Sequence, residues 1–242
     1  MFGLFIMDID NNNLDFSNSM SFDISEEFVP SSRRFVHYGS YNKTHLEIKV
    51  PMCINSQKSS FDSFDIGAIY KWLIGDNKYQ KLVFSSKDLS DIYFMAIVKE
   101  IETIAIGSDI IGVYVTFMCD SAGGYMFPIS QSFDIDGNSD ITVYNKGNSD
   151  NYDYPVISIS NIGQSKSIKI TSISDNGRTF EISDIADDID SFTIDCKNQT
   201  LNAQSLYKTC NFNFPRLVSG ENKFSISGNM HIDFYFSPKI YV

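Results

Sequence analysis

Acidic residues crowd one short stretch of the sequence, together with one asparagine, at Asp134, Asp136, Asn138 and Asp140. Carboxylate and amide oxygens are the ligands that a hard cation prefers, so this stretch resembles a calcium loop. Its spacing differs from that of an EF-hand, because Gly137 is the fourth residue and not the sixth, and Lys146 and Gly147 occupy the region of the required acid. We interpret the stretch as a solvated turn and predict no metal and no cofactor.

Paired acids elsewhere could act as the acid and base of a glycoside hydrolase, which needs two carboxyl groups about 5 to 9.5 Å apart. The pairs are Asp8 with Asp10 and Glu100 with Glu102. Acids that alternate along a strand share one face, usually the wet one, so solvation explains them equally well. The sequence has no Gly-x-Ser-x-Gly elbow, phosphate loop or dinucleotide fingerprint. We predict that the chain is not an enzyme.

The cysteines and histidines are not spaced as metal ligands. The four cysteines form no Cys-x-x-Cys pair and stand at Cys53, Cys119, Cys196 and Cys210. Three lie in or beside apolar runs, which predicts buried free thiols. His37, His45 and His231 have no second ligand nearby, so we expect no zinc site, and a Ser-His-Asp triad is a weak hypothesis.

Composition excludes several partners. The chain has 242 residues, of which 43% are hydrophobic, and its net charge is −11. Such a surface repels phosphates and anionic lipid, so we expect no nucleic acid and no membrane partner. No run reaches the roughly 18 apolar residues of a membrane span, and the first residues lack the basic region of a secretory signal. We expect synthesis as a soluble chain in the cytoplasm.

The elements that must position any site are predicted to be short strands, because the chain is poor in helix formers and rich in Ser, Asn, Asp, Ile, Phe and Tyr. Period-2 alternation occurs at residues 46–50, 167–171, 192–196 and 223–226. Apolar runs at 92–98 and 110–118 are typical of central strands. Asp175-Asn176-Gly177 indicates a type I′ hairpin turn. These patterns predict an all-β chain.

One helix is predicted over residues 63–75. Ile66, Ile69, Tyr70 and Leu73 recur there at the spacing of one buried helix face. Asp62 or Ser63 can cap its first amides, and Gly75 suits the position after its end. Trp72, the sole tryptophan, is expected to be buried on the sheet beside Ile69 and Leu73, with a ligand role as the alternative.

A domain boundary is predicted where the composition shifts to Ser, Gly, Asp and Asn between Cys119 and Asn151. We divide the chain into residues 1–128 and 129–242, two domains of ordinary size.

Motifs in the first half resemble the distal tail protein family of long-tailed bacteriophages, whose ring joins the tail tube to the adsorption apparatus. The motifs resemble those of the family in their order along the chain as well as in their residue types. It begins with a short strand and glycine at Phe2-Gly3, and continues with a helix ending in Trp72-Leu73. It then runs through residues 81–86, 91–98 and 101–102, and closes the domain with the strand at 113–119.

The second half follows the family's C-terminal pattern at residues 155–159, 192–196, 214–217 and 219–224. The most specific element is the last, a Pro-x-Leu followed by Gly-x-Asn, in which Pro fixes the entry to a strand pair and Gly and Asn form the turn. The resemblance covers nearly the whole chain.

The resemblance implies a ring-forming N-terminal β-sandwich with one helix and a C-terminal galectin-like β-sandwich. It implies a homo-oligomeric ring, a hexamer, in the virion tail, assembled in the host cytoplasm. The implied partners are the major tail tube protein, the tail-associated hub protein and a receptor-binding protein. A closed ring needs two different surfaces on each subunit.

Two alternatives belong to other classes. A carbohydrate-binding module or adhesin would use exposed aromatics, and the loop residues Tyr152 and Tyr154 are its candidates, for a sugar or for a partner. Against it, the second half has no Trp, and the segment 213–216 lacks the His that galectins place just upstream. A hydrolase of the adsorption machinery lacks an acid, base and nucleophile pattern.

Overall fold

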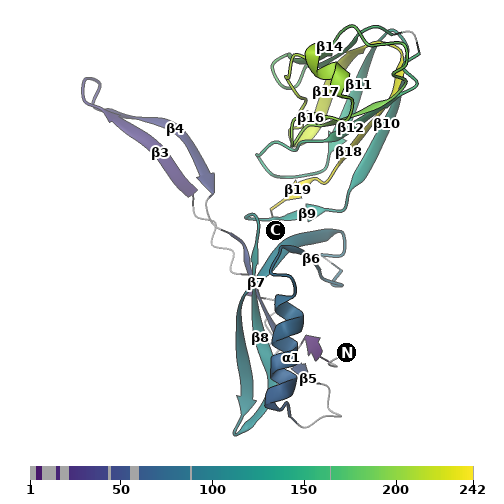
Figure 1. Cartoon of the computed structure of the whole chain (residues 1–242). Helices are drawn as coiled ribbons and strands as arrows, with labels where there is room; N and C mark the ends of the chain where they lie inside the picture. Colours follow the sequence, from purple (N-terminus) through teal and green to yellow (C-terminus); the bar gives the residue numbers. More distant parts are fainter. Residues whose placement is uncertain are drawn as a thin grey trace. The chain divides into compact units, whose positions relative to one another are not determined.

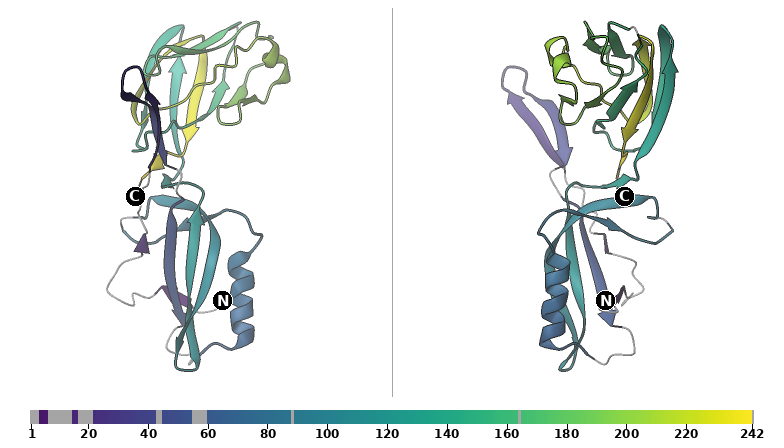
Figure 2. Two further views of the ribbon diagram at one scale, coloured as in Figure 1. Left: turned by 90° about the vertical axis from the view of Figure 1, so that its left-hand side faces the viewer. Right: turned by 45° about the vertical axis from the view of Figure 1, so that its right-hand side comes forward.

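The computed structural model of the chain describes residues 4–6, 15–16, 22–42, 45–54, 60–87, 89–163 and 165–241. The chain divides into two compact units, Met1–Gly124 and Tyr125–Val242. Strands make up most of the secondary structure (Figures 1 and 2), and α1 (Ser63–Ile74) is the single α-helix of the described residues. The predicted mainly β fold class is confirmed. No helix in the described ranges combines the length and apolar character needed to cross a membrane.

An antiparallel sheet forms the body of the first unit. The strands that the first unit contributes to it are β1 (Leu4–Ile6), β2 (Asp15–Phe16), β5 (Glu47–Ile54), β6 (Gln80–Val83), β7 (Ile92–Ile106) and β8 (Asp109–Cys119). β8 lies between β5 and β7, while β6 pairs with β7, and β1 and β2 pair with β5. The two apolar runs predicted as central strands are β7 and β8.

Alternation along β5 explains why it forms the sheet's interior. Ile48 and Val50 are buried, whereas the side chain of Lys49 between them is 44% exposed. The register places Ile48 opposite Phe117 and Val50 opposite Val115, both of them buried. The core of the first unit is therefore built from cross-strand apolar pairs.

Helix α1 (Ser63–Ile74) lies alongside β7 (Figure 2). It begins where predicted, because the carboxylate of Asp62 accepts hydrogen bonds from the backbone N–H groups of Phe64, at 2.9 Å, and Asp65, at 2.8 Å. Ile66 and Ile69 are its buried residues. Gly75 ends it with a positive φ of 50°, which glycine adopts without strain.

The expectation that Trp72 is buried is wrong. Its exposed fraction is 58%, whereas Ile69 is fully buried and Leu73 is half-buried. Successive helical residues are about 100° apart, so Trp72 lies off the face that carries Ile66, Ile69 and Leu73. The sequence periodicity identified that face correctly, and only the preference of tryptophan for the core was misleading.

A separate hairpin formed by β3 (Phe22–Val29) and β4 (Arg34–Asn42) makes a two-stranded sheet of its own (Figure 1). No strand was predicted here. The side chains from Asp23 to Tyr38 are exposed, apart from the half-buried Val29.

The second unit contains two antiparallel sheets. One has the order β10-β18-β12-β15-β16 and the other the order β11-β17-β13-β14. The strands are β10 (Ile129–Ile135), β11 (Asn138–Asn145), β12 (Val156–Ser160), β13 (Ile168–Ser172), β14 (Arg178–Ile182), β15 (Phe192–Asp195), β16 (Thr200–Leu201), β17 (Gly220–Ser227) and β18 (Met230–Phe236). A short 3₁₀ helix, η1 (Gln204–Lys208), also lies in this unit, whereas the strands β9 (Gly124–Met126) and β19 (Lys239–Ile240) belong to neither of these two sheets.

The core of the second unit lies in one apolar cluster to which both sheets contribute. Its fully buried members include Ile157, Ile194 and Phe234 from one sheet and Phe180 and Phe224 from the other. Three of the four predicted alternating segments, residues 167–171, 192–196 and 223–226, contribute to it, since apolar residues point inward at every second position. The unit is a β-sandwich, and its galectin-like character stays a prediction.

Side-chain amides cover the edges of one of these sheets. On edge strand β11, the backbone N–H of Tyr144 donates to the Gln131 amide oxygen at 2.9 Å, and the Gln131 amide nitrogen donates to the Tyr144 carbonyl at 2.8 Å. On edge strand β14, Asn211 donates to the Thr179 carbonyl at 2.9 Å and accepts from the Glu181 N–H at 3.1 Å. These amides take the place of a further strand.

Candidate functional site

The turn between β13 and β14 places a carboxylate inside the second unit. Asp175 is only 6% exposed. Asn176 and Gly177 have φ values of 53° and 73°, and the Arg178 N–H donates to the Asp175 carbonyl at 3.0 Å. Two successive positive φ angles define the predicted type I′ turn, which is confirmed.

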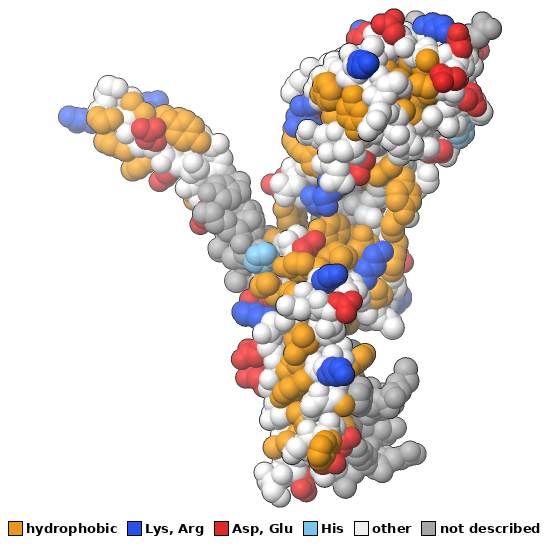
Figure 3. Space-filling view, viewed as in Figure 1, with side chains coloured by type: hydrophobic (Ala, Val, Ile, Leu, Met, Phe, Trp, Pro, Cys, Tyr) orange, Lys and Arg blue, Asp and Glu red, His pale blue; other side chains and the backbone are white. Residues whose placement is uncertain are grey.

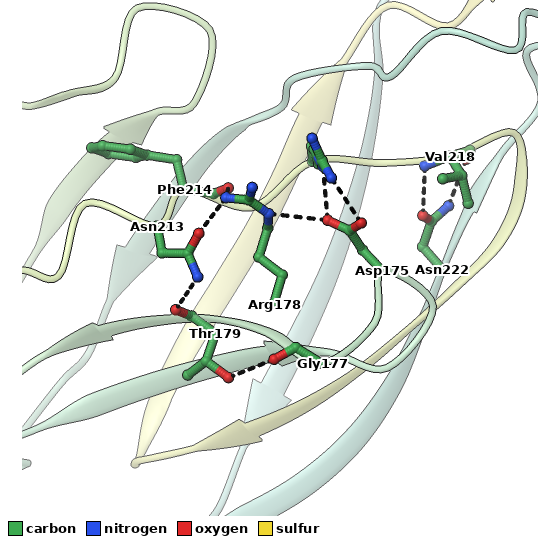
Figure 4. A network of polar contacts seen from close by, with 9 residues as sticks. Asp175, Gly177, Arg178, Thr179, Asn213, Phe214, Val218 and Asn222 are labelled. Carbon is green, nitrogen blue, oxygen red and sulfur yellow. Dashed lines mark hydrogen bonds and ion pairs between the residues drawn. The ribbon is translucent and has the colours of Figure 1, made fainter. Parts of the chain in front are cut away.

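Two guanidinium groups share the Asp175 carboxylate. Arg216 donates from Nε at 2.8 Å and from Nη2 at 3.0 Å, and the Nε of Arg178 lies 3.1 Å away (Figure 4). The hydrogen bonds from Arg216 are the largest cause of a lowered pKa for Asp175, and the charge of Arg178 adds to them against the opposing effect of burial. A carboxylate held ionised in this way is a poor proton carrier near neutral pH.

The two tyrosines predicted as contact residues lie beside this ion cluster. The Arg216 guanidinium carbon is 3.7 Å from the centre of the Tyr152 ring, a cation–π contact. Tyr152 is half-buried, whereas Tyr154 is 43% exposed. The structure thus brings Tyr152 into the Asp175 cluster and leaves Tyr154 as the more accessible ring. The role of these two tyrosines as contacts for a sugar or a partner stays a prediction.

Sequence reasoning missed the partnership of Asp175 and Arg216. Both residues stood in patterns that it noted, the Asp-Asn-Gly turn and the segment 213–216, but Asp175 and Arg216 are 41 residues apart. Only the pairing of the strands brings them together. The sequence held one clue to this ion cluster, which is that Arg178 and Arg216 are the two arginines of the second unit.

Asparagine side chains form two groups of hydrogen bonds in the segment before β17, one joined to the Asp175 cluster through Arg178 and one separate from it around Asn222. Arg178 donates to the side-chain oxygen of Asn213, and Asn213 donates to the Thr179 carbonyl at 3.0 Å (Figure 4). Asn222, which is 1% exposed, accepts from the Val218 N–H at 2.8 Å and donates to the Val218 carbonyl at 2.8 Å. These polar groups satisfy one another, which is the arrangement of a structural network.

The cysteines are buried and free, which confirms the predicted buried thiols. Burial raises the pKa of Cys119 to about 12 and also raises those of Cys53, Cys196 and Cys210. Since the thiolate is the nucleophile, these side chains are unreactive at neutral pH.

His231 contacts two carboxylates on the exposed face of β10 and β18. Its Nδ1 is 2.6 Å from Asp134 and its Nε2 is 3.5 Å from Asp233. The Asp134 hydrogen bond is the largest cause of a raised pKa for His231. The hydroxyl of Ser132 donates to Asp233 and not to the imidazole, so this group of residues is not a nucleophile and base pair.

The other candidate acids and histidines do not converge. The suspected calcium stretch turns from β10 to β11 inside the second unit, and in the described ranges no three His, Cys, Asp or Glu side chains are placed to hold a metal ion. Glu102 pairs with Lys49 at 2.5 Å, and Glu100 is exposed. His45 lies 2.8 Å from the Cys119 carbonyl. Asp8, Asp10 and Phe2-Gly3 lie outside the described residues.

Exposed apolar side chains gather on the β3–β4 hairpin (Figure 3). They are Ile24 (62% exposed), Phe28 (49%), Phe35 (63%), Val36 (40%) and Tyr38 (63%). Phe28 and Phe35 stand opposite each other in the register, with ring centroids 5.2 Å apart. Soluble monomers rarely leave so much apolar area uncovered on one short element.

A groove lies where the end of α1 meets β6 and β7. It has a volume of about 320 Å³ and is lined by Trp72, Leu73, Ile74, Lys78, Lys81 and Leu82, among others. Ile74 is 51% exposed, and Lys81 lies 4.6 Å from the centre of the Tyr93 ring. The walls of this groove, here called the α1 groove, combine apolar surface with basic side chains.

Two family models match the chain. The phage tail protein N-terminal domain matches residues 1–121, and the phage tail C-terminal domain matches residues 124–236. No curated protein sequence matches the chain significantly.

Solved structures share the fold. The chain is similar to the Dit protein of phage SPP1, described as a paradigm of the hub adsorption apparatus in phages that infect Gram-positive bacteria. The TM-score is 0.67 at 10% identity, over 98% of this chain and 93% of that one. The baseplate of phage P2 in its activated conformation gives a TM-score of 0.43 with calcium, at 10% identity, over 97% of this chain and 93% of that one. The baseplate of phage P2 in its activated conformation with strontium gives a TM-score of 0.42 at 10% identity, over 95% of this chain and 92% of that one.

Proposed function

Because the chain belongs to the phage tail protein family defined by these N-terminal and C-terminal domains, we propose that it is a structural ring protein at the distal end of a phage tail. In this role copies of the chain form a closed homo-oligomer, a hexamer, that joins the tail tube to the hub of the adsorption apparatus. The observation that carries the proposal is the fold of the SPP1 Dit protein over 98% of the chain.

Exposed apolar surface in the first unit supports assembly. The β3–β4 hairpin and the α1 groove carry large apolar side chains that are more than half exposed, including Phe35 and Trp72. Burying such area against another subunit is favourable at about 25 cal/mol per Å². We assign ring formation to residues 1–128, and docking or spacing to residues 129–242.

The proposed partners are the tail tube protein on one face of the ring, the hub protein on the other, and a receptor-binding protein. Assembly would take place in the host cytoplasm, and the mature location is the virion tail. A non-catalytic role agrees with the side chains described above, since the Asp175 carboxylate is held ionised and burial raises the pKa values of the four thiols.

Mass measurement tests the proposal. Purified protein at micromolar concentration should give a closed oligomer by light scattering or mass photometry, and rings in electron micrographs. Each subunit carries −11, so assembly should strengthen as salt screens repulsion over a Debye length of about 10 Å at 0.1 M. A monomer at every salt concentration, also in the presence of the tube protein, would contradict the ring.

A carbohydrate-binding module is the second candidate, and the specific observation in its favour is the exposed ring of Tyr154 near Arg216. The ring of Tyr152 is less suited, because the guanidinium already covers one of its faces. Glycan-array binding that Tyr154→Ala abolishes, and that Tyr235→Ala leaves intact, would favour this candidate. Tyr235 is a matched control, since it is also exposed on the second unit.

A further inference from the structure

The hairpin presents one apolar face, which is made by Ile24, Phe28 and Phe35. Phe28 and Phe35 are opposite in the register, and Ile24 lies four residues before Phe28 on β3. The register shift between Ser25 and Glu26 places the extra residue, Tyr38, on β4, so the alternation along β3 puts Ile24 on the same side as Phe28. Glu26 lies between Ile24 and Phe28 on that side. An isolated two-stranded hairpin is marginally stable in water, so this face requires a cover.

The α1 groove has the complementary character. Trp72, Ile74 and Leu82 provide apolar walls, and Lys78 and Lys81 provide two positive charges against the single acid Asp76. The hairpin face brings the opposite charge through Glu26 alone, because Asp23 and Glu27 alternate to the other side of β3, and Arg33 and Arg34 lie at the turn end of the hairpin. Opposite charges fix the register of a contact more than they add to its affinity.

We propose that the Ile24–Phe28–Phe35 face of one copy packs into the α1 groove of a second copy, with Glu26 of the hairpin directed to Lys78 of the groove. The inference rests on the proposed ring function. Because the hairpin face and the groove are different surfaces, the contact is heterologous, and it propagates from copy to copy until rotation closes it. It supplies the two surfaces that each ring subunit needs.

Mixing two variants of the full chain tests the pairing. A hairpin variant carries Ile24→Thr and Phe35→Thr, which keep strand propensity. A groove variant carries Trp72→Gln and Ile74→Gln, which keep helix propensity. Each variant alone should stay monomeric, whereas a 1:1 mixture should form a dimer and nothing larger, because only the intact hairpin and the intact groove can meet.

The outcomes separate this inference from the ring itself. If both variants still form the closed oligomer of the unmodified chain, the ring function stands and this interface is wrong. If both are monomers and their mixture also stays monomeric, the hairpin and groove do not pair. If the unmodified chain never assembles, the ring function and the interface fall together. Ile173→Thr, at an exposed position of the second unit, is the matched control and should assemble normally.

Charge reversal tests the register. Glu26→Lys and Lys78→Glu should each weaken assembly severalfold, and the double variant should recover most of the loss. Two losses that simply add would overturn the Glu26–Lys78 contact. Circular dichroism of each variant checks that the fold is retained.

Discussion

Ile69 and Trp72 show how the position of a residue on a helix outweighs its type. Ile69 is fully buried, whereas Trp72 is 58% exposed. Ile69→Ala should lower the free energy of unfolding by about 2 to 5 kcal/mol, through lost burial and a cavity. Trp72→Ala should cost about 1 kcal/mol or less in the unassembled chain. Urea denaturation measures both, and a larger loss at Trp72 would show that its ring is buried after all.

Asp175 makes stability depend on pH through its two guanidinium partners. Its pKa is lower in the folded state than in the unfolded chain. The stabilisation is therefore complete above the unfolded-state pKa of about 3.9 and is lost as the pH falls through the folded-state pKa. Asp175→Asn should cost about 1 to 3 kcal/mol at neutral pH, because it leaves two guanidinium groups without a counter-charge.

The comparison of Asp175→Asn with the unmodified protein should be made across the acid range. As the pH falls below about 4, the difference in unfolding free energy between the two proteins should shrink over roughly one to two pH units. Asp187→Asn is the control, since Asp187 forms an exposed ion pair with Lys166 and should change stability by less than about 0.5 kcal/mol. A pH-independent difference would mean that the Asp175 ion pairs contribute nothing.

At the scale of elements, the Gln131 amide acts as a short piece of strand for β11. Gln131→Leu should leave the Tyr144 N–H and carbonyl to water, with a loss of about 0.5 to 1.5 kcal/mol. Hydrogen exchange at the Tyr144 amide should accelerate, whereas exchange in β13 should not change. Ser130→Ala, one residue away on the same strand, is the control. Unchanged exchange at Tyr144 would show that the amide does not protect this edge.

Elements with strong periodicity could be predicted from the sequence, and those without it could not. The alternation around Ile48 and Ile170 identified strands because one side of each faces the core. The β3–β4 hairpin was missed because its exposed side chains show no buried face to create a pattern. The ion cluster was missed for another reason: Asp175 and Arg216 meet only through tertiary pairing, which local patterns do not encode.

At the scale of the whole chain, the two units should separate. The apolar cluster of the second unit draws all its buried members from residues 135–236. Residues 125–242 alone should therefore unfold in one cooperative transition and stay monomeric, because the proposed interface belongs to the first unit. Residues 1–128 alone should assemble as the full chain does. A monomeric 1–128 fragment, beside an assembled full chain, would place the assembly surface in the second unit.

The amide-covered edges have a consequence for crowding. A ring tethers its subunits permanently, so each second unit would meet its neighbours at an effective concentration in the millimolar range. At that concentration, an uncovered strand edge can pair with the edge strand of the next copy, and ring assembly would then compete with the growth of fibres. Gln131 and Asn211 occupy the hydrogen-bonding groups that such growth would need on β11 and β14. In the proposed ring, these two side-chain amides would therefore keep the β11 and β14 edges from pairing with neighbouring copies.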